Sequence, residues 1–354
     1  MFASHVSIYL IPVIAAAASA GLAYILTPFV RALALRLHAV DVPSDERRMH
    51  TDSVPQLGGL AIFLGAFGSA LAGRLVIGGI APDVLQSVGW TDGEMLAVLA
   101  GSLVILLLGI VDDIRPLSAR LKLPVQAAAA LIVVAFGGLR IDLASDLLGS
   151  GFDFLPGWLS WPVTVIWILA VTNGLNFIDG LDGLACGVGG IASFALFLIL
   201  ILTGNPVQAV LFSALGGACL GFLPYNVHPA KIFMGDTGAT FLGFMLGGLS
   251  IMAVQSDPKA SFFAPVLALS LPLFDLAFAV VRRVARGMSP FEADSGHIHH
   301  RLIRKGLSVR RAVTLAWGFT ALECFFAVVA VWWPRAGVFA GLATVVVFAL
   351  FVVC

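Results

Sequence analysis

Residues 184–203 read LACGVGGIASFALFLILILT and carry no charged side chain. A bilayer span requires about 20 consecutive apolar residues, so this stretch predicts a transmembrane helix. The rest of the chain agrees, because 60% of its 354 residues are hydrophobic and only 11% are charged. Soluble domains are about one quarter charged. The sequence therefore predicts an all-α, polytopic membrane bundle.

Similar apolar runs lie on both sides of this stretch and bring the expected number of transmembrane helices to about eleven. We treat residues 1–354 as a single integral membrane domain. The four cysteines predict neither a disulfide framework nor a metal site, because no pair has the required spacing. The expected helices are Val6–Val30, Leu57–Ile77, Gly93–Val111, Pro124–Leu139, Trp158–Phe177, Leu184–Thr203, Val207–Pro224, Thr237–Val254, Ser261–Val281, Ala312–Trp333 and Ala336–Val353.

Basic residues are concentrated on one side of these helices, where 16 of the 20 Lys and Arg residues lie. An excess of Lys and Arg marks the cytoplasmic side, so we expect the N-terminus outside and the C-terminus in the cytoplasm. The net charge of zero gives no bulk attraction to nucleic acid. The inner segments are Arg31–Gln56, Asp112–Leu123, Gly174–Gly183, Tyr225–Asp236 and Arg282–Arg311.

The first two inner segments carry charged residues that could serve a reaction. Arg48 and His50 could contact a lipid phosphate, or could belong to a solvated loop beside anionic headgroups. Asp112 and Asp113 adjoin the end of the third expected helix, where like charges repel and burial near lipid is costly. They are either functional or an ordinary acidic pair at a helix end. Lys122 follows on the same segment and could meet an anionic ligand.

The third inner segment contains NGLNFIDGLDGL, residues 173–184. Its polar members Asn173, Asn176, Asp179 and Asp182 recur every three residues, and the interspersed glycines disfavour a continuous helix. Carboxamide and carboxylate oxygens suit a hard divalent cation or nucleotide hydroxyls. Four such residues at one membrane boundary favour a functional site over helix–helix hydrogen bonding.

The fourth inner segment contains NVHPAKIFMGDTG, residues 226–238. Gly235 and Asp236 lie at the start of the eighth expected helix, just before Thr237, where free backbone amides can hold a phosphate. Asp236 could bind Mg²⁺ bridging to that phosphate, or could cap the helix. Phe233 could stack on a base, or could contact lipid. Asn226 opens the motif.

The fifth inner segment contains DSGHIHHRLIRK, residues 294–305. His297, His299, His300 and Arg301 favour phosphate binding, with these side chains as donors. Zinc is the alternative, although the segment has no Cys and no closed tetrahedral set of ligands.

Two acids, Asp275 and Glu323, lie within expected transmembrane helices. Intramembrane acids suggest function, and an ion-coupled transporter would use them. The crowding of motifs on one face, rather than at the middle of the membrane, opposes that alternative. We expect Asp275 to support the site and assign no role to Glu323.

Taken in order, these blocks resemble the polyprenyl-phosphate N-acetylhexosamine-1-phosphate transferases. The His-Ile-His-His-Arg form at residues 297–301 is similar to the branch that starts O-antigen, enterobacterial common antigen or teichoic acid, which usually uses UDP-N-acetylglucosamine. The peptidoglycan branch typically carries three consecutive histidines and ten helices. It transfers phospho-N-acetylmuramoyl-pentapeptide and is the alternative within this family.

The resemblance implies transfer of N-acetylglucosamine 1-phosphate from UDP-N-acetylglucosamine to undecaprenyl or a similar polyprenyl phosphate, with release of UMP. This would be the first membrane step in synthesis of a cell-envelope polysaccharide such as lipopolysaccharide. It also implies the bacterial inner membrane, an active site on the cytoplasmic face, and a homodimer.

The resemblance further implies Mg²⁺, with Mn²⁺ as the alternative, held by Asp236 and Asn176. Asp112 and Asp113 would be catalytic, as proton acceptor, as positioning or metal-contacting groups, or as a covalent nucleophile. The residues expected to bind the UDP-sugar and its phosphates are Lys122, Asn173, Asp179, Asp182, Asn226, Phe233, Gly235, His297, His299, His300 and Arg301.

Overall fold

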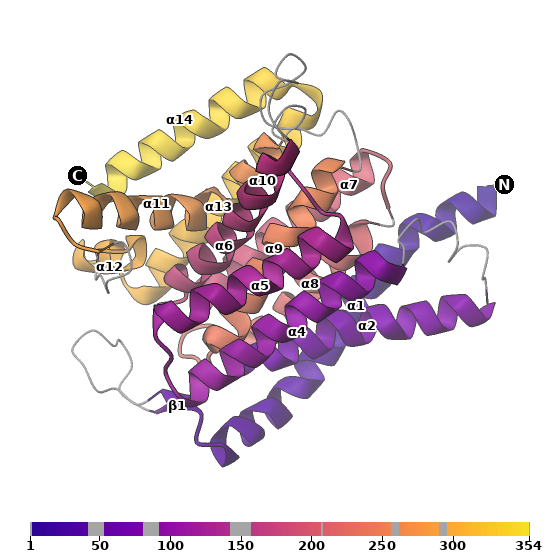
Figure 1. The fold of residues 1–354 in the computed structure, drawn as a ribbon, viewed down its shortest axis with the longest axis horizontal. Helices are drawn as coiled ribbons and strands as arrows, with labels where there is room; N and C mark the ends of the chain where they lie inside the picture. The colour runs from indigo at the N-terminus through magenta and orange to yellow at the C-terminus, as the bar shows by residue number, and fades with distance from the viewer. Residues whose placement is uncertain are drawn as a thin grey trace.

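The computed structural model describes residues 2–41, 53–80, 92–141, 157–206, 208–255, 262–289 and 296–353, and most of them form long helices that run side by side (Figure 1). The elements are α1 (Phe2–Arg36), β1 (Val40–Asp41), β2 (Val54–Pro55), α2 (Gly58–Ile80), α4 (Asp92–Ile114), α5 (Ala119–Gly137), the 3-10 helix η2 (Gly157–Leu159), α6 (Ser160–Ile178), α7 (Leu184–Leu202), α8 (Ala209–Asn226), α9 (Gly235–Gln255), α10 (Phe263–Ala268), α11 (Ser270–Ala285), α12 (Ile298–Arg304), α13 (Val309–Trp332) and α14 (Pro334–Val353).

Nine helices within the described residues are long and apolar enough to cross a membrane. The apolar stretch at residues 184–203 forms one of them, Leu184–Leu202. These helices confirm a polytopic helical membrane protein. The number of eleven spans and the sides of the two termini stay predictions.

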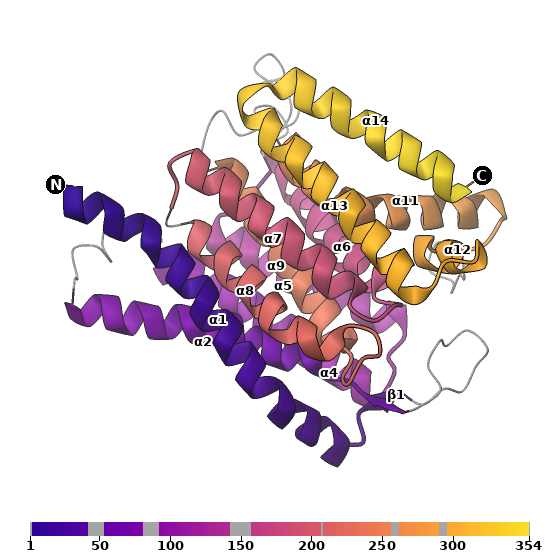
Figure 2. The same ribbon diagram turned by 180° about the vertical axis from the view of Figure 1, so that it is seen from behind.

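Helix α9 lies at the centre of the bundle, and 94% of its most apolar stretch is buried. It packs against α2, α4, α6 and α7. Figure 1 shows α4 and α5 in front of it, and Figure 2 shows α7 and α8 on the opposite side. A helix that is apolar around its whole circumference can lie in a protein core or face lipid, and the close approach of Gly238 to Gly59 and of Gly243 to the Thr172 backbone places α9 in the core. The first turn of α9 is consequently surrounded by the ends of other helices.

Two close approaches bring helix backbones together. Gly109 of α4 faces the backbone of Thr237 and Asp236, so that a side chain at this glycine would overlap them. Gly217 and Gly221 of α8 face backbone carbonyls of α1 in the same way. Small residues at such contacts are typical of membrane helices, because association there depends on close packing.

The ninth expected helix, Ser261–Val281, is wrong as a continuous element. It divides at Leu269 into α10 and α11. Pro272 has no backbone N–H to donate to the Ala268 carbonyl, and that carbonyl instead faces the Cys324 sulfur at 4.0 Å. The expected end of the third helix at Val111 is also too early, because α4 continues to Ile114 and includes Asp112 and Asp113.

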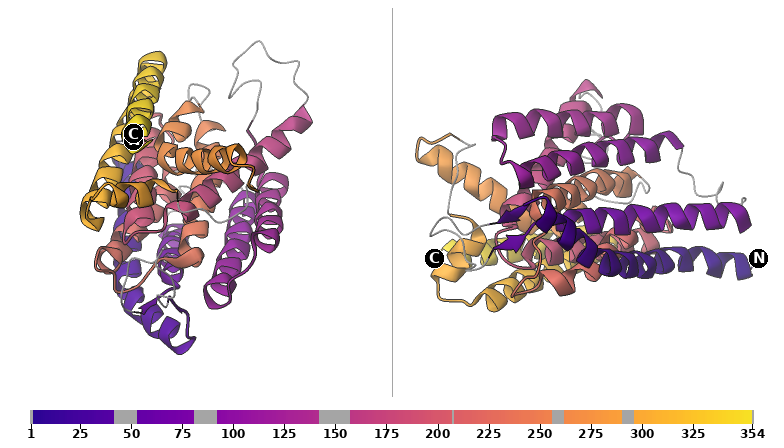
Figure 3. Two further views of the ribbon diagram at one scale, coloured as in Figure 1. Left: turned by 90° about the vertical axis from the view of Figure 1, so that its left-hand side faces the viewer. Right: turned by 90° about the horizontal axis from the view of Figure 1, so that it is seen from below.

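The segments between α4 and α5, α6 and α7, and α8 and α9 meet at one end of the bundle, viewed face-on in the left panel of Figure 3. The antiparallel pair β1–β2 lies at the same end. Phe233 N donates to the Pro55 carbonyl at 2.8 Å, and Gly58 N donates to the Phe233 carbonyl at 3.0 Å. These bonds hold the hairpin against the segment that leads into α9.

The contact at Gly109 generates a prediction about stability. Gly109→Ala should lower the midpoint of thermal unfolding of the purified protein, because the added methyl group forces α4 away from α9 at a cost of about 1–3 kcal/mol. Gly248→Ala in α9 is the matched control, since a Cβ there meets nothing within 4 Å. Equal midpoints for the two variants would contradict this packing.

Candidate active site

A cavity of about 480 Å³ opens at this end of the bundle. Its walls come from segments far apart in the sequence, and five of its lining side chains are aspartates. The lining residues are Asp41, Val54, Gln56, Asp113, Asn176, Asp179, Gly180, Leu181, Asp182, Asn226, His228, Pro229, Ala230, Phe233, Gly235, Asp236, His299, His300 and Val309. We call this space the acidic cavity.

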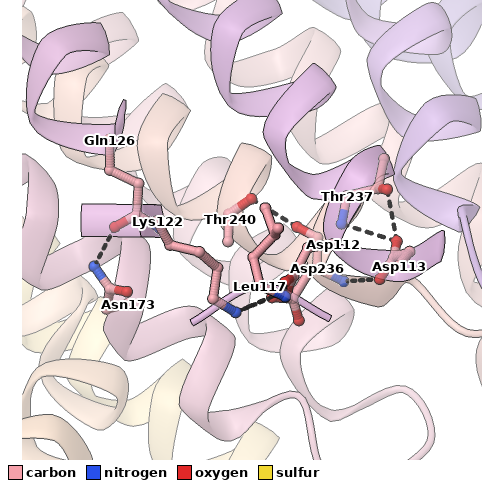
Figure 4. Close-up of polar contacts among 9 residues, drawn as sticks. All are labelled: Asp112, Asp113, Leu117, Lys122, Gln126, Asn173, Asp236, Thr237 and Thr240. Atoms are coloured by element: carbon pink, nitrogen blue, oxygen red, sulfur yellow. Dashed lines mark hydrogen bonds and ion pairs between the residues drawn. The ribbon is translucent and has the colours of Figure 1, made fainter. Parts of the chain in front are cut away.

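Lys122 of α5 joins two carboxylates beside the acidic cavity (Figure 4). Its Nζ lies 2.7 Å from Asp112 Oδ2 and 2.8 Å from Asp236 Oδ2. The other oxygen of Asp112 accepts a 2.6 Å hydrogen bond from Leu117 N. One ammonium group therefore reduces the repulsion between two acids, and it ties α4, α5 and α9 together.

Asp113 has a different set of partners from its neighbour. Its Oδ1 accepts from Asp236 N at 2.8 Å, and its Oδ2 accepts from Thr237 N at 3.1 Å and from the Thr237 hydroxyl at 2.6 Å. Asp113 thus caps the start of α9, where the first backbone N–H groups of a helix lack partners of their own. The helix cap considered for Asp236 is supplied by Asp113 instead.

Two members of the third motif add oxygens to the same cavity. The Asn176 side chain lies beside the Asp236 carboxylate at the cavity wall. Burial raises the pKa of Asp179 well above its usual value, and the nearby carboxylates of Asp236, Asp113 and Asp182 raise it further. A cation in this cavity would relieve the repulsion among these four acids.

Asp182 holds the segment between α8 and α9. Its Oδ2 lies 2.7 Å from His228 Nδ1 and accepts from Ala230 N at 3.1 Å. Asn226 donates to the Ile232 carbonyl at 3.1 Å, while its buried Oδ1 has no partner among the described residues. That oxygen belongs to a cavity-lining residue and can accept a hydrogen bond from a bound molecule.

Phe233 and Gly235 complete this wall. Gly235 has a φ of +71°, and a side chain there would overlap the Asp113 carboxylate. Glycine is therefore required for Asp113 to reach the start of α9.

The histidines of the fifth motif divide into two groups. His299 and His300 line the acidic cavity. His297 does not; its Nδ1 lies 2.7 Å from Asp275 Oδ2, and Asp275 Oδ1 accepts from Ile298 N at 2.7 Å. The interpretation of Asp275 as a supporting residue is thus confirmed, because it holds both His297 and the start of α12.

His299 is 3% exposed and packs against Gly180, where a side chain would overlap its ring. Burial lowers the pKa of His299 well below its usual value, and the His300 and His297 rings lower it further. The ring is therefore neutral near pH 7. Its Nδ1 has no hydrogen-bond partner among the described residues.

Four predicted ligand-binding residues lie outside the lining of the acidic cavity, namely Lys122 and His297, described above, and Asn173 and Arg301. Asn173 Nδ2 donates to Gln126 Oε1 and to the Leu169 carbonyl, both at 2.8 Å, so it joins α6 to α5. Arg301 Nε donates to the Gly296 carbonyl at 3.1 Å, and its guanidinium lies 4.9 Å from the centre of the Phe278 ring. Neither Asn173 nor Arg301 is a lining residue of the cavity, and their roles in binding stay predictions. The predicted contacts Arg48 and His50 lie outside the described residues.

Several lining residues were not predicted, among them His228, Asp41 and Gln56. His228 stands inside the fourth motif, and only its pairing with Asp182 gives it a role. Asp41 and Gln56 reach the cavity through the β1–β2 hairpin, which is too short to leave a clear pattern in the sequence.

No group of three His, Cys, Asp or Glu side chains within the described part of the chain is placed to hold a metal ion alone. Mg²⁺ usually binds one or two carboxylates and completes its coordination with water and substrate phosphates. Asp236 and the adjacent Asn176 present such oxygens at the cavity wall.

Comparison with known proteins relates this site to one family. The pattern of glycosyl transferase family 4 matches residues 95–254. The chain is 39% identical over 292 residues to a probable undecaprenyl-phosphate N-acetylglucosaminyl 1-phosphate transferase of Bacillus subtilis, covering 82% of this chain and 76% of the relative.

Two further relatives extend the comparison. A decaprenyl-phosphate N-acetylglucosaminephosphotransferase of Mycolicibacterium smegmatis is 35% identical over 327 residues, covering 87% of this chain and 79% of the relative. The undecaprenyl-phosphate alpha-N-acetylglucosaminyl 1-phosphate transferase of Escherichia coli K12 is 29% identical over 294 residues, covering 81% and 75%.

The different partners of the two adjacent acids can be tested by thermal unfolding. Asp113→Asn should lower the midpoint, because an amide NH₂ would face a backbone N–H; the loss of such a cap costs about 1–2 kcal/mol. Asp112→Asn should lower it less, since Lys122 keeps its bond to Asp236. An unchanged midpoint in Asp113→Asn would show that the cap adds nothing to stability.

Proposed function

Because this membrane protein belongs to glycosyl transferase family 4 and is a sugar-phosphate transferase, we propose that it transfers N-acetylglucosamine 1-phosphate from UDP-N-acetylglucosamine to a polyprenyl phosphate such as undecaprenyl phosphate. An oxygen of the lipid phosphate attacks the phosphorus that bears the sugar. The bond from that phosphorus to the bridging oxygen breaks, and UMP leaves. The products are a polyprenyl-diphospho-sugar and UMP.

The observation that carries this proposal is the Lys122 ammonium held between Asp112 and Asp236 at the edge of the acidic cavity. The reaction brings together two anionic phosphates, which repel each other unless positive charge lies between them. Lys122 supplies such a charge at a position fixed by two carboxylates. Its location at the end of the helices suits a reaction between a water-soluble donor and a lipid acceptor.

The five aspartates of the acidic cavity support a requirement for Mg²⁺, with Mn²⁺ as an alternative. An anionic donor would not enter so acidic a space without a cation. Asp236 and Asn176 would hold the ion, which would neutralise charge on the diphosphate oxygens. Lys122 binds phosphate beside this position, and His299 and His300 offer ring nitrogens from the opposite wall.

The nucleoside is assigned to the wall formed by the third and fourth motifs. The unpartnered Oδ1 of Asn226 accepts a hydrogen bond from the donor, and Phe233 offers an aromatic face to the base. Asp182 positions this wall through His228 and Ala230. Asp113 acts by fixing the first turn of α9, which carries Asp236.

Asp112 is assigned a positioning role toward Lys122. Both of its oxygens are engaged, one by Lys122 and one by Leu117 N. A lipid phosphate has a second pKa near 6, as phosphoserine does, so it is already largely ionised at neutral pH. Proton removal by Asp112 would then add little, and a covalent role would require it to leave both partners.

The basic side of the chain supports an active site on the cytoplasmic face of the bacterial inner membrane. The five inner segments that hold 16 of the 20 Lys and Arg residues also carry most of the residues that line the acidic cavity. UDP-sugars would reach the cavity from that side. The product would enter cell-envelope polysaccharide synthesis. Homodimer formation stays a prediction.

A donor panel tests the proposed reaction. Purified protein should release UMP from UDP-N-acetylglucosamine only when polyprenyl phosphate and Mg²⁺ are both present, and should form the lipid diphosphate sugar. UDP-N-acetylgalactosamine and UDP-N-acetylmuramoyl-pentapeptide are the comparison donors. Faster turnover of the pentapeptide donor would favour the peptidoglycan reaction, and no UMP from any donor would refute the transferase assignment.

Lys122→Met should reduce turnover by about 10²–10³, the range seen when a group that stabilises transition-state charge is removed. Lys231→Met is the matched control, because Lys231 is exposed in the segment before α9 and its side chain has no role in the site. Its turnover should stay within about twofold of the unchanged protein, as expected for a surface substitution. Similar activity of the two variants would remove Lys122 from the mechanism.

A further inference from the structure

A second cavity, of about 940 Å³, lies between α13 and α14. The two helices meet at residues 332–334 and diverge toward α12, as Figure 2 shows. Except for two arginines and two threonines, the lining is apolar. It consists of Arg310, Arg311, Thr314, Leu315, Gly318, Phe319, Leu322, Ala343, Thr344, Val347, Phe348 and Phe351. We call this space the α13–α14 groove.

Contacts between the two helices keep the groove open. Phe319 and Phe348 stack with ring centres 4.1 Å apart and an angle of 16° between their planes. The Thr344 hydroxyl donates to the carboxylate of Glu323, which is fully buried in α13. Gly318 lines the groove, and a Cβ at this position would meet nothing within 4 Å. The space is therefore preformed and unfilled by side chains.

The end of the groove nearest α12 is basic. Arg310 and Arg311 line it, and no acidic side chain does. Lys305 Nζ lies 5.6 Å from the centre of the Phe351 ring, so it adds a third positive charge at this end. The Arg310 guanidinium donates to the His228 carbonyl at 3.2 Å, whereas the Arg311 side chain makes no ion pair with any described residue.

We propose that the α13–α14 groove binds an anionic phospholipid of the bilayer, with an acyl chain between the helices and the phosphate on Arg311. Apolar walls open to the membrane suit a hydrocarbon chain, since Leu322 is 42% exposed and Val347 is 66% exposed. A basic end at the membrane boundary suits an anionic headgroup. The groove shares no lining residue with the acidic cavity, so a phosphate on Arg311 lies outside the reacting site.

Native mass spectrometry of the purified full-length protein tests this proposal. The protein is titrated with dioleoyl phosphatidylglycerol or with dioleoyl phosphatidylcholine, so that only the headgroup charge differs. The unchanged protein should retain phosphatidylglycerol in preference. Arg311→Gln should reduce this preference about fivefold, which corresponds to one basic residue near an anionic headgroup. Gly318→Leu should reduce retention of both lipids, because the side chain fills the groove.

Two matched variants control for charge and for side-chain volume. Arg36→Gln removes an exposed arginine at the end of α1, and Gly21→Leu adds the same side chain at an exposed glycine of α1. Both should bind lipid as the unchanged protein does. Thermal unfolding checks that Gly318→Leu folds, which is expected because leucine favours helices more than glycine does.

Three outcomes would overturn the proposal: no preference for phosphatidylglycerol, equal effects of the test and control variants, or displacement of phosphatidylglycerol by polyprenyl phosphate. The last result would assign the groove to the acceptor. UMP release, measured separately for each variant, distinguishes a failure of this proposal from a failure of the transferase function.

Discussion

The Lys122 ammonium shared by Asp112 and Asp236 is the interaction on which the geometry of the site depends. It draws together the end of α4, the first turn of α5 and the first turn of α9. The carboxylates of Asp112 and Asp236, both in contact with one ammonium group, repel each other strongly where protein and lipid replace much of the water. The helix ends would therefore separate without the Lys122 ammonium. Asp113 strengthens the same junction by capping α9 with three hydrogen bonds. The two adjacent acids thus both act on the start of α9. Asp112 acts through the salt bridge that Lys122 shares with Asp236, and Asp113 acts through its hydrogen bonds to the first residues of the helix.

The transmembrane helices could be predicted from the sequence, because about 20 apolar residues are a property of a single segment. The gathering of motifs at one end followed from the alternation of short loops.

The partner of each acid could not be predicted in this way. Successive residues of a helix point about 100° apart, so the different roles of Asp112 and Asp113 depend on where α5 and α9 lie. Pro272 in the sequence could have predicted the break of the ninth helix at Leu269. The role of His228 could not be predicted, because it depends on a contact with Asp182, which is 46 residues away in the sequence.

The fifth motif shows how one short sequence serves two purposes. His297 precedes α12 and is held by Asp275, while His299, two residues later, occupies the space that Gly180 leaves beside the acidic cavity. Arg301 turns back to the Gly296 carbonyl. Residue types alone suggested that all four side chains grip a phosphate. In the structure the first contacts Asp275 and the last contacts the Gly296 carbonyl and the Phe278 ring, while the middle two lie at the wall of the cavity.

The acidity of the cavity bears on the roles of its carboxylates in the proposed reaction. A site for two anionic substrates would ordinarily be basic, yet five aspartates line this one. Such an arrangement is favourable only if the carboxylates hold cations, since cations reverse the effective charge that a phosphate meets. Lys122 is one such cation, held between Asp112 and Asp236. A divalent ion beside Asn176 would add further positive charge to the cavity. The acceptor phosphate is largely ionised at neutral pH, so a proton acceptor is of little use there. The acids of this site are therefore better understood as a frame that fixes positive charge between two phosphates than as bases.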